Sequence, residues 1–255
     1  MFDGKRFRLD GTVALVTGAG AGISRAIAEI FAGAGAAVAV TDMDAAAAEN
    51  VAAKITAEGG RAIGVACNVM RDADLEAVVD QTLKVFGGLT ILVNNAGGGG
   101  PKPFDMPMTE MHRAFQLNVF SVFRLCQLAA PHMEAAGGGA ILNITSMSAE
   151  NRNRQMASYS SSKAAESHLT RNIAHDLGPM NILVNAIAPG ATRTAALQKV
   201  LNPETEAAML RHTPLKRLGE PQDMANAALF LCSPAASWIS GQILTVSGGG
   251  VQELD

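Results

Sequence analysis

Aromatic residues are scarce in this sequence: they make up 4% of its 255 residues, with a single tyrosine and a single tryptophan. An excess of one charge is also missing, because 20 basic and 23 acidic residues leave a formal net charge of −3. That balance gives no reason to expect a nucleic acid or an anionic membrane surface as a partner. The five histidines lack metal-ligand spacing and no GxSxG motif occurs, so the sequence favours neither a metal site nor serine hydrolysis.

Uninterrupted apolar runs are short as well. None approaches the roughly 18 residues that a membrane-spanning helix needs, and Glu29 interrupts the best candidate. No apolar segment follows Met1, so we expect no export signal. Cys67, Cys126 and Cys232 are odd in number and lack CxxC spacing, which is typical of buried, reduced thiols. Together these features predict a cytoplasmic protein.

What the sequence does have is a regular alternation of short β-branched runs with alanine-rich helical stretches. The expected strands are 13–16, 38–41, 63–67, 91–93, 140–144, 182–187 and 243–246, and the clearest helices are about 23–32, 44–58 and 157–177. Continuous apolar strands separated by helices are typical of a parallel sheet that is covered on both faces. Without a linker or a repeat, residues 1–255 predict one doubly wound, Rossmann-type α/β domain with about seven parallel strands and helices on both faces.

The alternation breaks down late in the chain, over residues 192–221. Two short helical pieces are expected there, around Asn202 and Pro203. A substrate lid over the carboxyl ends of the strands would lie at this point of the chain. The pattern alone fits an ordinary surface excursion equally well.

A glycine-rich turn from Thr17 to Ile23 joins the first expected strand to the first helix. Small residues such as Gly18 and Gly22 let the backbone approach a pyrophosphate, and the helix N-terminus offers free N–H groups and partial positive charge. Asp42 ends the second strand, where a carboxylate accepts hydrogen bonds from the adenosine ribose. A helix N-cap is the other interpretation of Asp42, although Asp44 is also available for that position.

The same carboxylate predicts the choice of dinucleotide. Asp42 would repel the 2′-phosphate of NADP, and the glycine turn holds no lysine or arginine to attract it. We therefore expect NAD as the cofactor. Arg25 and Arg61 are the basic residues that would act against this preference.

The only tyrosine, Tyr159, precedes Lys163 by four residues, so the expected helix carries both on one face. A free phenol loses its proton only near pH ~10, too high for a base at neutral pH. An ammonium about 4 Å away contributes about 4 kcal/mol at an effective dielectric near 20, which brings ionisation into a useful range. Such a pair is more often an ordinary helix-surface pair, so the spacing alone leaves both interpretations open.

A set of short segments along the chain resembles one known family. In order, these are Thr17–Ile23, Asn94–Gly97, Asn118, Ser146, Tyr159 with Lys163, and Pro189–Gly190. Their order and spacing are similar to those of the short-chain dehydrogenases/reductases, and the resemblance covers nearly the whole chain. It implies an oxidoreductase that moves a hydride between NAD(H) and an alcohol or ketone carbon.

The resemblance also implies roles for individual residues. Tyr159 would be the general acid and base, and Ser146 would hold and orient the substrate oxygen. Lys163 would assist the ionisation of Tyr159 and bind the nicotinamide ribose, while Asn118 would support a water-linked proton relay. The implied cofactor contacts are Gly18, Gly22, Ile23, Asp42, Met43, Asn68, Val69, Asn95, Gly97, Tyr159, Lys163, Thr192, Arg193 and Thr194.

Three positions depart from the pattern of the family. Ser24 stands where a third glycine is usual, which predicts a helix slightly farther from the cofactor and a weaker affinity for it. Asn68 replaces a frequent aspartate near the adenine, and Ser247 replaces another near the C-terminus. None of the three touches the expected proton chemistry.

Longer segments narrow the expected substrate. Asn94–Met108, Pro189–Thr194 and Arg217–Leu254 resemble the bacterial members of the family that oxidise the 7α-hydroxyl of bile acids to a 7-oxo group. The implied substrate contacts are Gly99, Ser146, Asn151 and Tyr159. The glycines at 97–100 would leave room for fused rings, although taken alone they are more typical of a flexible loop.

Other interpretations remain at this point. A reductase of 3-oxoacyl thioesters or a dehydrogenase of sugar alcohols would share the motifs, whereas a non-catalytic dinucleotide-sensing module would not need Ser146, Tyr159 and Lys163 together. The family resemblance further implies a homotetramer, with contacts through the segment around Trp238 and the expected helix 157–177.

Overall fold

The computed structural model describes residues 3–151 and 154–250. At its centre lies a seven-stranded sheet in the order β3-β2-β1-β4-β5-β6-β7, with every neighbouring pair parallel. The strands are β1 (Val13–Thr17), β2 (Ala37–Asp42), β3 (Arg61–Ala66), β4 (Ile91–Asn94), β5 (Gly139–Ile144), β6 (Ile182–Pro189) and β7 (Ile243–Val246). The predicted single doubly wound domain is confirmed, and each expected strand lies within two residues of the observed one.

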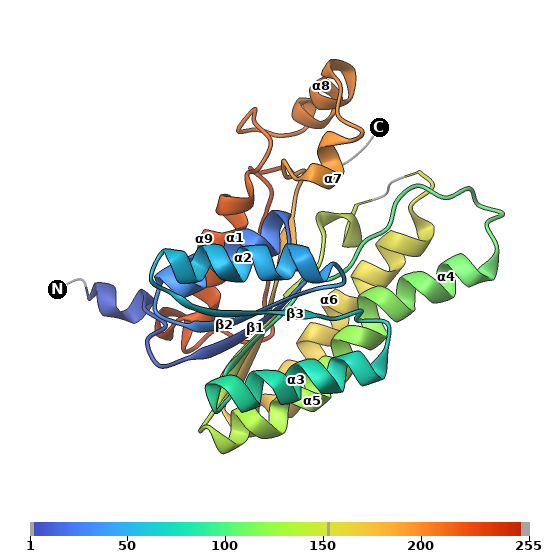
Figure 1. The fold of residues 1–255 in the computed structure, drawn as a ribbon. Coiled ribbons are helices and arrows are strands. Elements are labelled where there is room, and N and C mark those ends of the chain that lie inside the picture. Colours follow the sequence, from blue (N-terminus) through green and yellow to red (C-terminus); the bar gives the residue numbers. More distant parts are fainter. Residues whose placement is uncertain (1–2, 152–153, 251–255) are drawn as a thin grey trace.

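Helices cover both faces of the sheet (Figure 1). One layer contains α1 (Gly22–Gly33), α2 (Ala45–Ala57) and α9 (Pro221–Cys232), and the other contains α3 (Asp72–Phe86), α5 (Ser121–Ala135) and α6 (Ala157–Leu177). α4 (Met108–Phe115) leads through a π-helical turn, η2 (Gln116–Phe120), directly into α5. Short 3-10 turns complete the described elements: η1 (Gly4–Phe7), η3 (Met147–Ala149), η4 (Gly178–Met180) and η5 (Pro234–Ala236).

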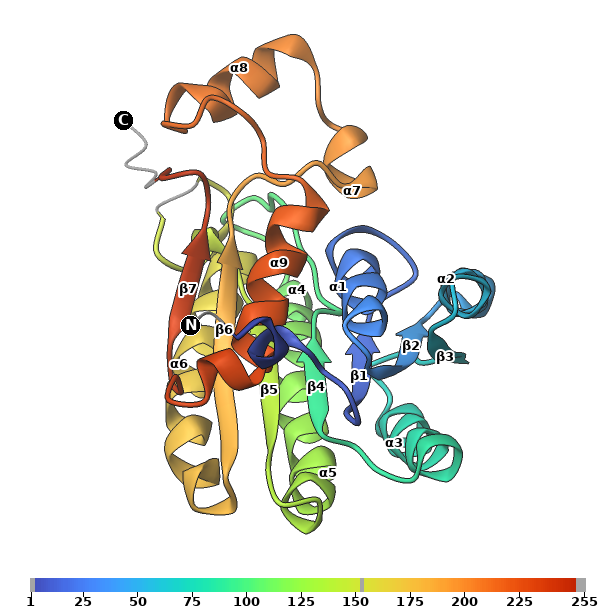
Figure 2. The ribbon, with the colours of Figure 1, turned by 90° about the vertical axis from the view of Figure 1, so that its left-hand side faces the viewer.

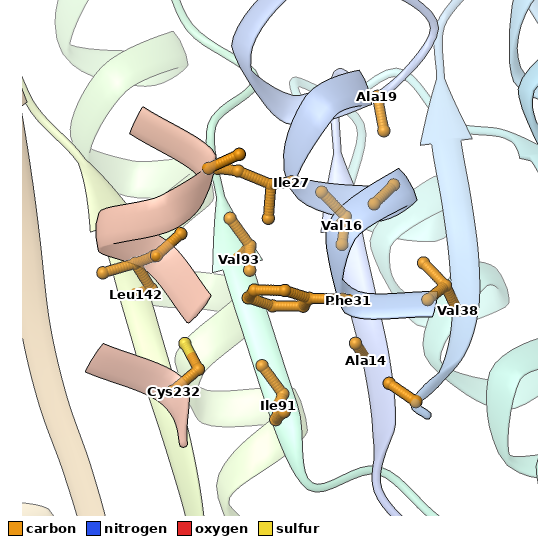
Figure 3. Packing of buried hydrophobic residues seen from close by; sticks show 14 of the residues in the cluster. Ala14, Val16, Ala19, Ile27, Phe31, Val38, Ile91, Val93, Leu142 and Cys232 are labelled. Atoms are coloured by element: carbon orange, nitrogen blue, oxygen red, sulfur yellow. The ribbon is translucent and has the colours of Figure 1, made fainter. Parts of the chain in front are cut away.

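The two helical layers explain why the central strands are apolar throughout. All five residues of β1 are buried, since each face of that strand contacts a helix. On one face, Phe31 of α1 is fully buried among Val38 of β2 and Ile91 and Val93 of β4 (Figure 3). The edge strands β3 and β7 are only partly covered, unlike the uniformly buried strands that the sequence predicts.

The strand order creates a crevice at the carboxyl ends of the central strands. β1 pairs with both β2 and β4, so the chain runs outward to β3 and then returns to the other side of β1. At such a reversal, the loops that follow the two inner strands separate and leave a ligand-sized opening at their carboxyl ends. The fold thus places the glycine turn after β1 and the Asn94–Gly97 segment after β4 at the same opening.

Beyond these carboxyl ends stand two short helices, α7 (Ala195–Gln198) and α8 (Pro203–Arg211) (Figure 2). They are the helical pieces expected on either side of Asn202, whose side chain caps α8 by accepting a hydrogen bond from the Thr205 backbone at 2.9 Å. Within residues 3–151 and 154–250, none of the helices combines the length and the apolar character needed to cross a membrane.

Candidate active site

A cleft of about 470 Å³ lies at the carboxyl ends of the central strands. The loops after β1, β4, β5 and β6 form its walls, together with the start of α6. Its lining includes Gly18, Gly22, Ile23, Asn95, Gly97, Ser146, Tyr159, Lys163, Thr192 and Thr194, all of them expected site residues. Segments that are more than 100 residues apart in the sequence therefore meet around one space.

The glycine turn forms the end of this cleft nearest β1. Gly18 and Gly22 both have φ near +64°, a left-handed conformation that disfavours residues with a side chain. A Cβ on Gly18 would also lie 3.0 Å from the Ala96 Cα. Ala21, the N-cap of α1, makes no side-chain capping bond, so the first N–H groups of the helix remain available to an anion. The turn thus fits a pyrophosphate at a helix N-terminus.

Ser24 ties this turn to the loop after β4. The side chain is fully buried, and its hydroxyl donates to the Gly18 carbonyl and accepts a hydrogen bond from Asn95 Nδ2, the latter at 2.8 Å. Thr17 adds a second tie, because its hydroxyl accepts hydrogen bonds from the backbone N–H groups of Asn95 and Ala96, each at 3.0 Å. The residue that departs from the glycine pattern therefore joins the two loops across the crevice.

Asp42 faces the glycine turn from the end of β2. Its Oδ2 accepts a hydrogen bond from the Gly20 backbone at 3.0 Å, and its Oδ1 accepts one from the Asp44 backbone at 3.0 Å. Asp44 is the N-cap of α2, since its Oδ1 accepts from the Ala47 backbone at 3.2 Å. The two interpretations of Asp42 are thereby separated, because the capping position belongs to Asp44. Asp42 holds a carboxylate beside the turn, where a ribose would lie.

The other expected adenosine contacts surround Asp42. Met43 is 78% exposed, directly after β2. Asn68 follows β3, and its Oδ1 accepts a hydrogen bond from the Met70 backbone at 3.1 Å, which shapes the loop. Val69 is buried and packs in the apolar cluster that also contains residues of α3 and α5.

Asn118 lies in the π-helical turn and is fully buried. Its side chain holds Gly98 from both sides: Oδ1 accepts from the Gly98 N–H at 2.9 Å, and Nδ2 donates to the Gly98 carbonyl at 3.0 Å. Nδ2 also donates to the Ser162 hydroxyl at 2.9 Å, and that hydroxyl donates to the Tyr159 carbonyl at 2.7 Å. Asn118 thus fixes the loop after β4 against the helix that carries Tyr159.

Ser146, Tyr159 and Lys163 converge on the cleft from two elements. Ser146 follows β5, and its hydroxyl accepts a hydrogen bond from the Ser148 backbone at 3.1 Å, which caps η3. Tyr159 and Lys163 lie in the first two turns of α6, and all three residues line the cleft. Gly99 packs against the back of the tyrosine ring: a Cβ there would lie 2.6 Å from Tyr159 Cδ2.

The Lys163 side chain is 5% exposed and makes two interactions in the interior. Its ammonium donates to the Ile144 carbonyl at 2.8 Å and to Glu166 Oε2 at 2.7 Å. Burial raises the pKa of the Glu166 carboxyl to about 7, and the positive charge of Lys163 acts in the opposite direction. An ammonium has three N–H groups, so one remains for a ligand in the cleft.

The segment after β6 closes the cleft on the side of α7. Thr192 is buried and bonded to the Gly190 carbonyl at 2.9 Å, while the Thr194 methyl group lies 3.5 Å from the Cβ position of Gly22. Arg193 points elsewhere: its guanidinium pairs with Glu206 at 2.9 Å and with Glu220 at 3.3 Å. Its side chain thus ties α8 to the start of α9.

Two expected substrate contacts lie outside the cleft lining. Gly99 lines a neighbouring cavity of about 550 Å³, between the loop after β4 and α4. Asn151 lies just beyond η3, next to residues 152–153, which are outside the described part of the chain.

Comparisons with known proteins agree with this geometry. A family model described as enoyl-(acyl carrier protein) reductase matches residues 18–250. A short-chain type dehydrogenase/reductase from Mycobacterium marinum is 36% identical, and its crystal structure superposes with a TM-score of 0.91 over 96% of this chain and 97% of the other. The chain belongs to the short-chain dehydrogenase/reductase family.

Within the short-chain dehydrogenases/reductases, one similarity spans the full length of both chains. A 7alpha-hydroxysteroid dehydrogenase of Escherichia coli K12 is 61% identical over 255 residues, which is 100% of each chain. A solved structure of a 7alpha-hydroxysteroid dehydrogenase in complex with NADH and 7-oxo glycochenodeoxycholic acid is 61% identical, with a TM-score of 0.98 and complete coverage of both chains.

Three residues of this short-chain dehydrogenase/reductase site were not predicted from the sequence. Thr17 belongs to the expected glycine turn, but its bonds to the loop after β4 depend on the sheet register. Ser162 stands three residues after Tyr159, and Glu166 three residues after Lys163, so both share a helix face with the expected pair. That spacing was a signal for Glu166, since a carboxylate on the buried face of a helix requires a partner.

Proposed function

We propose that the chain is an NAD-dependent dehydrogenase that oxidises the 7α-hydroxyl of bile acids to a 7-oxo group, in a reversible reaction. The observation that carries the proposal is the meeting of Ser146, Tyr159 and Lys163 with the glycine turn in one cleft. Full-length identity of 61% to a 7alpha-hydroxysteroid dehydrogenase supports the choice of substrate.

The side chains of the cleft handle the proton of the reaction. In the oxidative direction, the Tyr159 oxygen takes the proton of the substrate hydroxyl, helped by the positive charge of Lys163 one helical turn away. The Ser146 hydroxyl donates a hydrogen bond to the substrate oxygen and stabilises its developing negative charge. When bound, NAD⁺ supplies the acceptor for the hydride that leaves the carbon.

The cofactor preference follows from charge. Asp42 would accept hydrogen bonds from the adenosine ribose hydroxyls and would repel a 2′-phosphate. Of the two basic residues that would act against this preference, Arg25 is paired with Glu29 at 2.9 Å, and Arg61 lies at the opposite end of β3 from Asp42, in register with Ala37. We therefore propose NAD in preference to NADP.

The segment 192–221 is proposed to be a lid over the substrate. Its helices α7 and α8 stand over the carboxyl ends of the strands, and Leu197 reaches the cleft lining. The ion pairs of Arg193 with Glu206 and Glu220 would hold this segment at its base.

A homotetramer in the cytoplasm is the expected assembly and location. Large apolar side chains are exposed on two separate surfaces, at Phe120 and Phe123 near the start of α5 and at Trp238 and Leu244 beside the edge strand β7. Two such surfaces suit an assembly with more than one kind of two-fold contact. Light scattering of the purified chain measures its mass directly.

The test of the catalytic proposal is a substrate panel combined with Tyr159→Phe. We expect NAD⁺-dependent oxidation of bile acids that carry a 7α-hydroxyl, and little turnover of 7β epimers, sugar alcohols or 3-hydroxyacyl thioesters. Tyr159→Phe should lower kcat by about 10³-fold while NADH binding persists, because only the proton acceptor is removed. Ser160→Ala, at the next position of the same helix, is the matched control and should retain activity. Equal turnover of Tyr159→Phe and the unaltered chain would overturn the acid–base role.

A further inference from the structure

Glu166 is a buried acid for which the reaction described above has no use. It lies on α6 one turn after Lys163, and its side chain is 1% exposed. Its Oε2 accepts a hydrogen bond from the Lys163 ammonium at 2.7 Å, whereas its Oε1 has no hydrogen-bond partner in the described structure. Burying a carboxylate with one oxygen unsatisfied is unfavourable, so such a group calls for an explanation.

The surroundings of Glu166 contain few other charges. The titratable groups that interact with it are Lys163 on the same helix and Cys126 on α5, and burial raises the pKa of the Cys126 thiol to about 12. The adjacent strands contribute neutral amides: Asn94 of β4 donates to Asn143 of β5 at 2.9 Å. The charge of Lys163 is therefore the one that Glu166 directly offsets.

We propose that Glu166 is a positioning residue that anchors Lys163 and sets the pH range in which Tyr159 accepts a proton. This inference rests on the proposed function. Two of the three ammonium protons of Lys163 point to Ile144 O and Glu166, which aims the third at the cleft. The carboxylate also cancels part of the positive charge that favours the ionised phenol. Lys163 is thus held in place by a group that weakens its electrostatic effect.

The size of this effect follows from helix geometry. Glu166 stands seven residues after Tyr159, and a helix rises 1.5 Å per residue, so the two side chains are about 10 Å apart. One unit charge at that distance, with an effective dielectric near 20, displaces the ionisation of the phenol by about one pH unit. Because the carboxylate is negative, its removal favours the ionised phenol and moves the transition to lower pH.

Tyr159 is the only tyrosine in the chain, so absorbance near 295 nm reports the ionisation of this one phenol. We would titrate the full-length chain, with and without NAD⁺, and compare it with Glu166→Gln, which keeps a hydrogen-bond acceptor but removes the charge. The expected midpoint for Glu166→Gln is lower by about one pH unit. The acid limb of the kcat/KM profile for oxidation should move in the same direction.

Two further variants separate charge from anchoring. Asp176→Asn removes an exposed carboxylate from the far end of the same helix and should leave the midpoint unchanged. Glu166→Ala removes both the charge and the anchor, so it should also raise the KM for NAD⁺, which Glu166→Gln should not.

The result that overturns the inference is a Glu166→Gln midpoint that is equal to or higher than that of the unaltered chain. Because the absorbance titration needs no substrate, it decides the inference even when bile acids are not oxidised. Failure of the substrate panel with a displaced midpoint would reject the proposed function alone.

Discussion

Replacing Asp42 by asparagine tests the basis of the cofactor preference. Asparagine keeps an oxygen of similar position, so the hydrogen bond from the Gly20 backbone, 3.0 Å in the unaltered chain, has an acceptor in the variant. The change therefore removes charge while largely preserving the shape of the loop. We expect the variant to accept NADP far better and NAD somewhat less well.

The magnitude follows from the position of Asp42, which is half-buried at the end of β2. A 2′-phosphate carries a charge of about −1.5 to −2. At about 5 Å from a carboxylate, with an effective dielectric near 40, the repulsion amounts to about 2–3 kcal/mol. Weaker hydrogen bonds to the NAD ribose contribute about 1 kcal/mol more. The ratio of kcat/KM for NAD to that for NADP should thus fall by about two to three orders of magnitude.

The assay measures initial rates with both dinucleotides, at saturating bile acid and at low and high salt. Asp44→Asn is the matched control, because it removes a carboxylate two residues away that caps α2 rather than facing the glycine turn. This control should change the ratio by no more than about threefold. Any effect of the weaker cap should instead be a lower free energy of unfolding. An unchanged ratio for Asp42→Asn, or an equal change for Asp44→Asn, would refute the assignment of the preference to Asp42.

Two other substitutions test the packing around the site and the core. Gly99→Ala places a Cβ 2.6 Å from Tyr159 Cδ2 and should lower kcat by about 10- to 100-fold in steady-state assays. Gly100→Ala meets no atom within 4 Å, so a similar loss in that variant would contradict the steric explanation. Phe31→Ala empties a fully buried position between α1 and the sheet and should cost about 3–5 kcal/mol in urea unfolding. A cost below about 1 kcal/mol would show that the cavity closes.

The sequence predicts those features of the fold that neighbouring residues determine, and it fails for features that depend on distant parts of the chain. α6 begins at Ala157 and ends at Leu177, the limits expected from the sequence, and Gly178 and Pro179 follow its last residue. The π-helical turn at Gln116–Phe120 was not predicted, because one extra residue in a helical turn leaves almost no trace in the hydrophobic pattern. The exposure of β3 and β7 depends on their position at the edges of the sheet, and the sequence of a strand alone does not specify that position.

The same distinction applies to the site. Short sequence motifs were enough to identify Ser146, Tyr159 and Lys163 as site residues, and in the structure all three line one cleft. The hydroxyl of Ser24, by contrast, bonds to Asn95, a residue 71 positions away, and only the pairing of β1 with β4 creates that contact. The spacing of Glu166 from Lys163 is visible in the sequence, but its burial is not, since that burial arises from packing against distant elements.

The residues that line the cleft come from segments between Gly18 and Leu197 in the sequence. One of the strands that position them, β6, lies inside the sheet between β5 and β7. A fragment that ends before Ile182 would retain the tyrosine and the lysine yet lack an interior strand, the far wall and the helix α9 that packs on α1. Recovery of catalysis after dilution from denaturant should therefore follow the slowest step of chain assembly. Turnover becomes a reporter of complete refolding, whereas helical circular dichroism would register partial products as well.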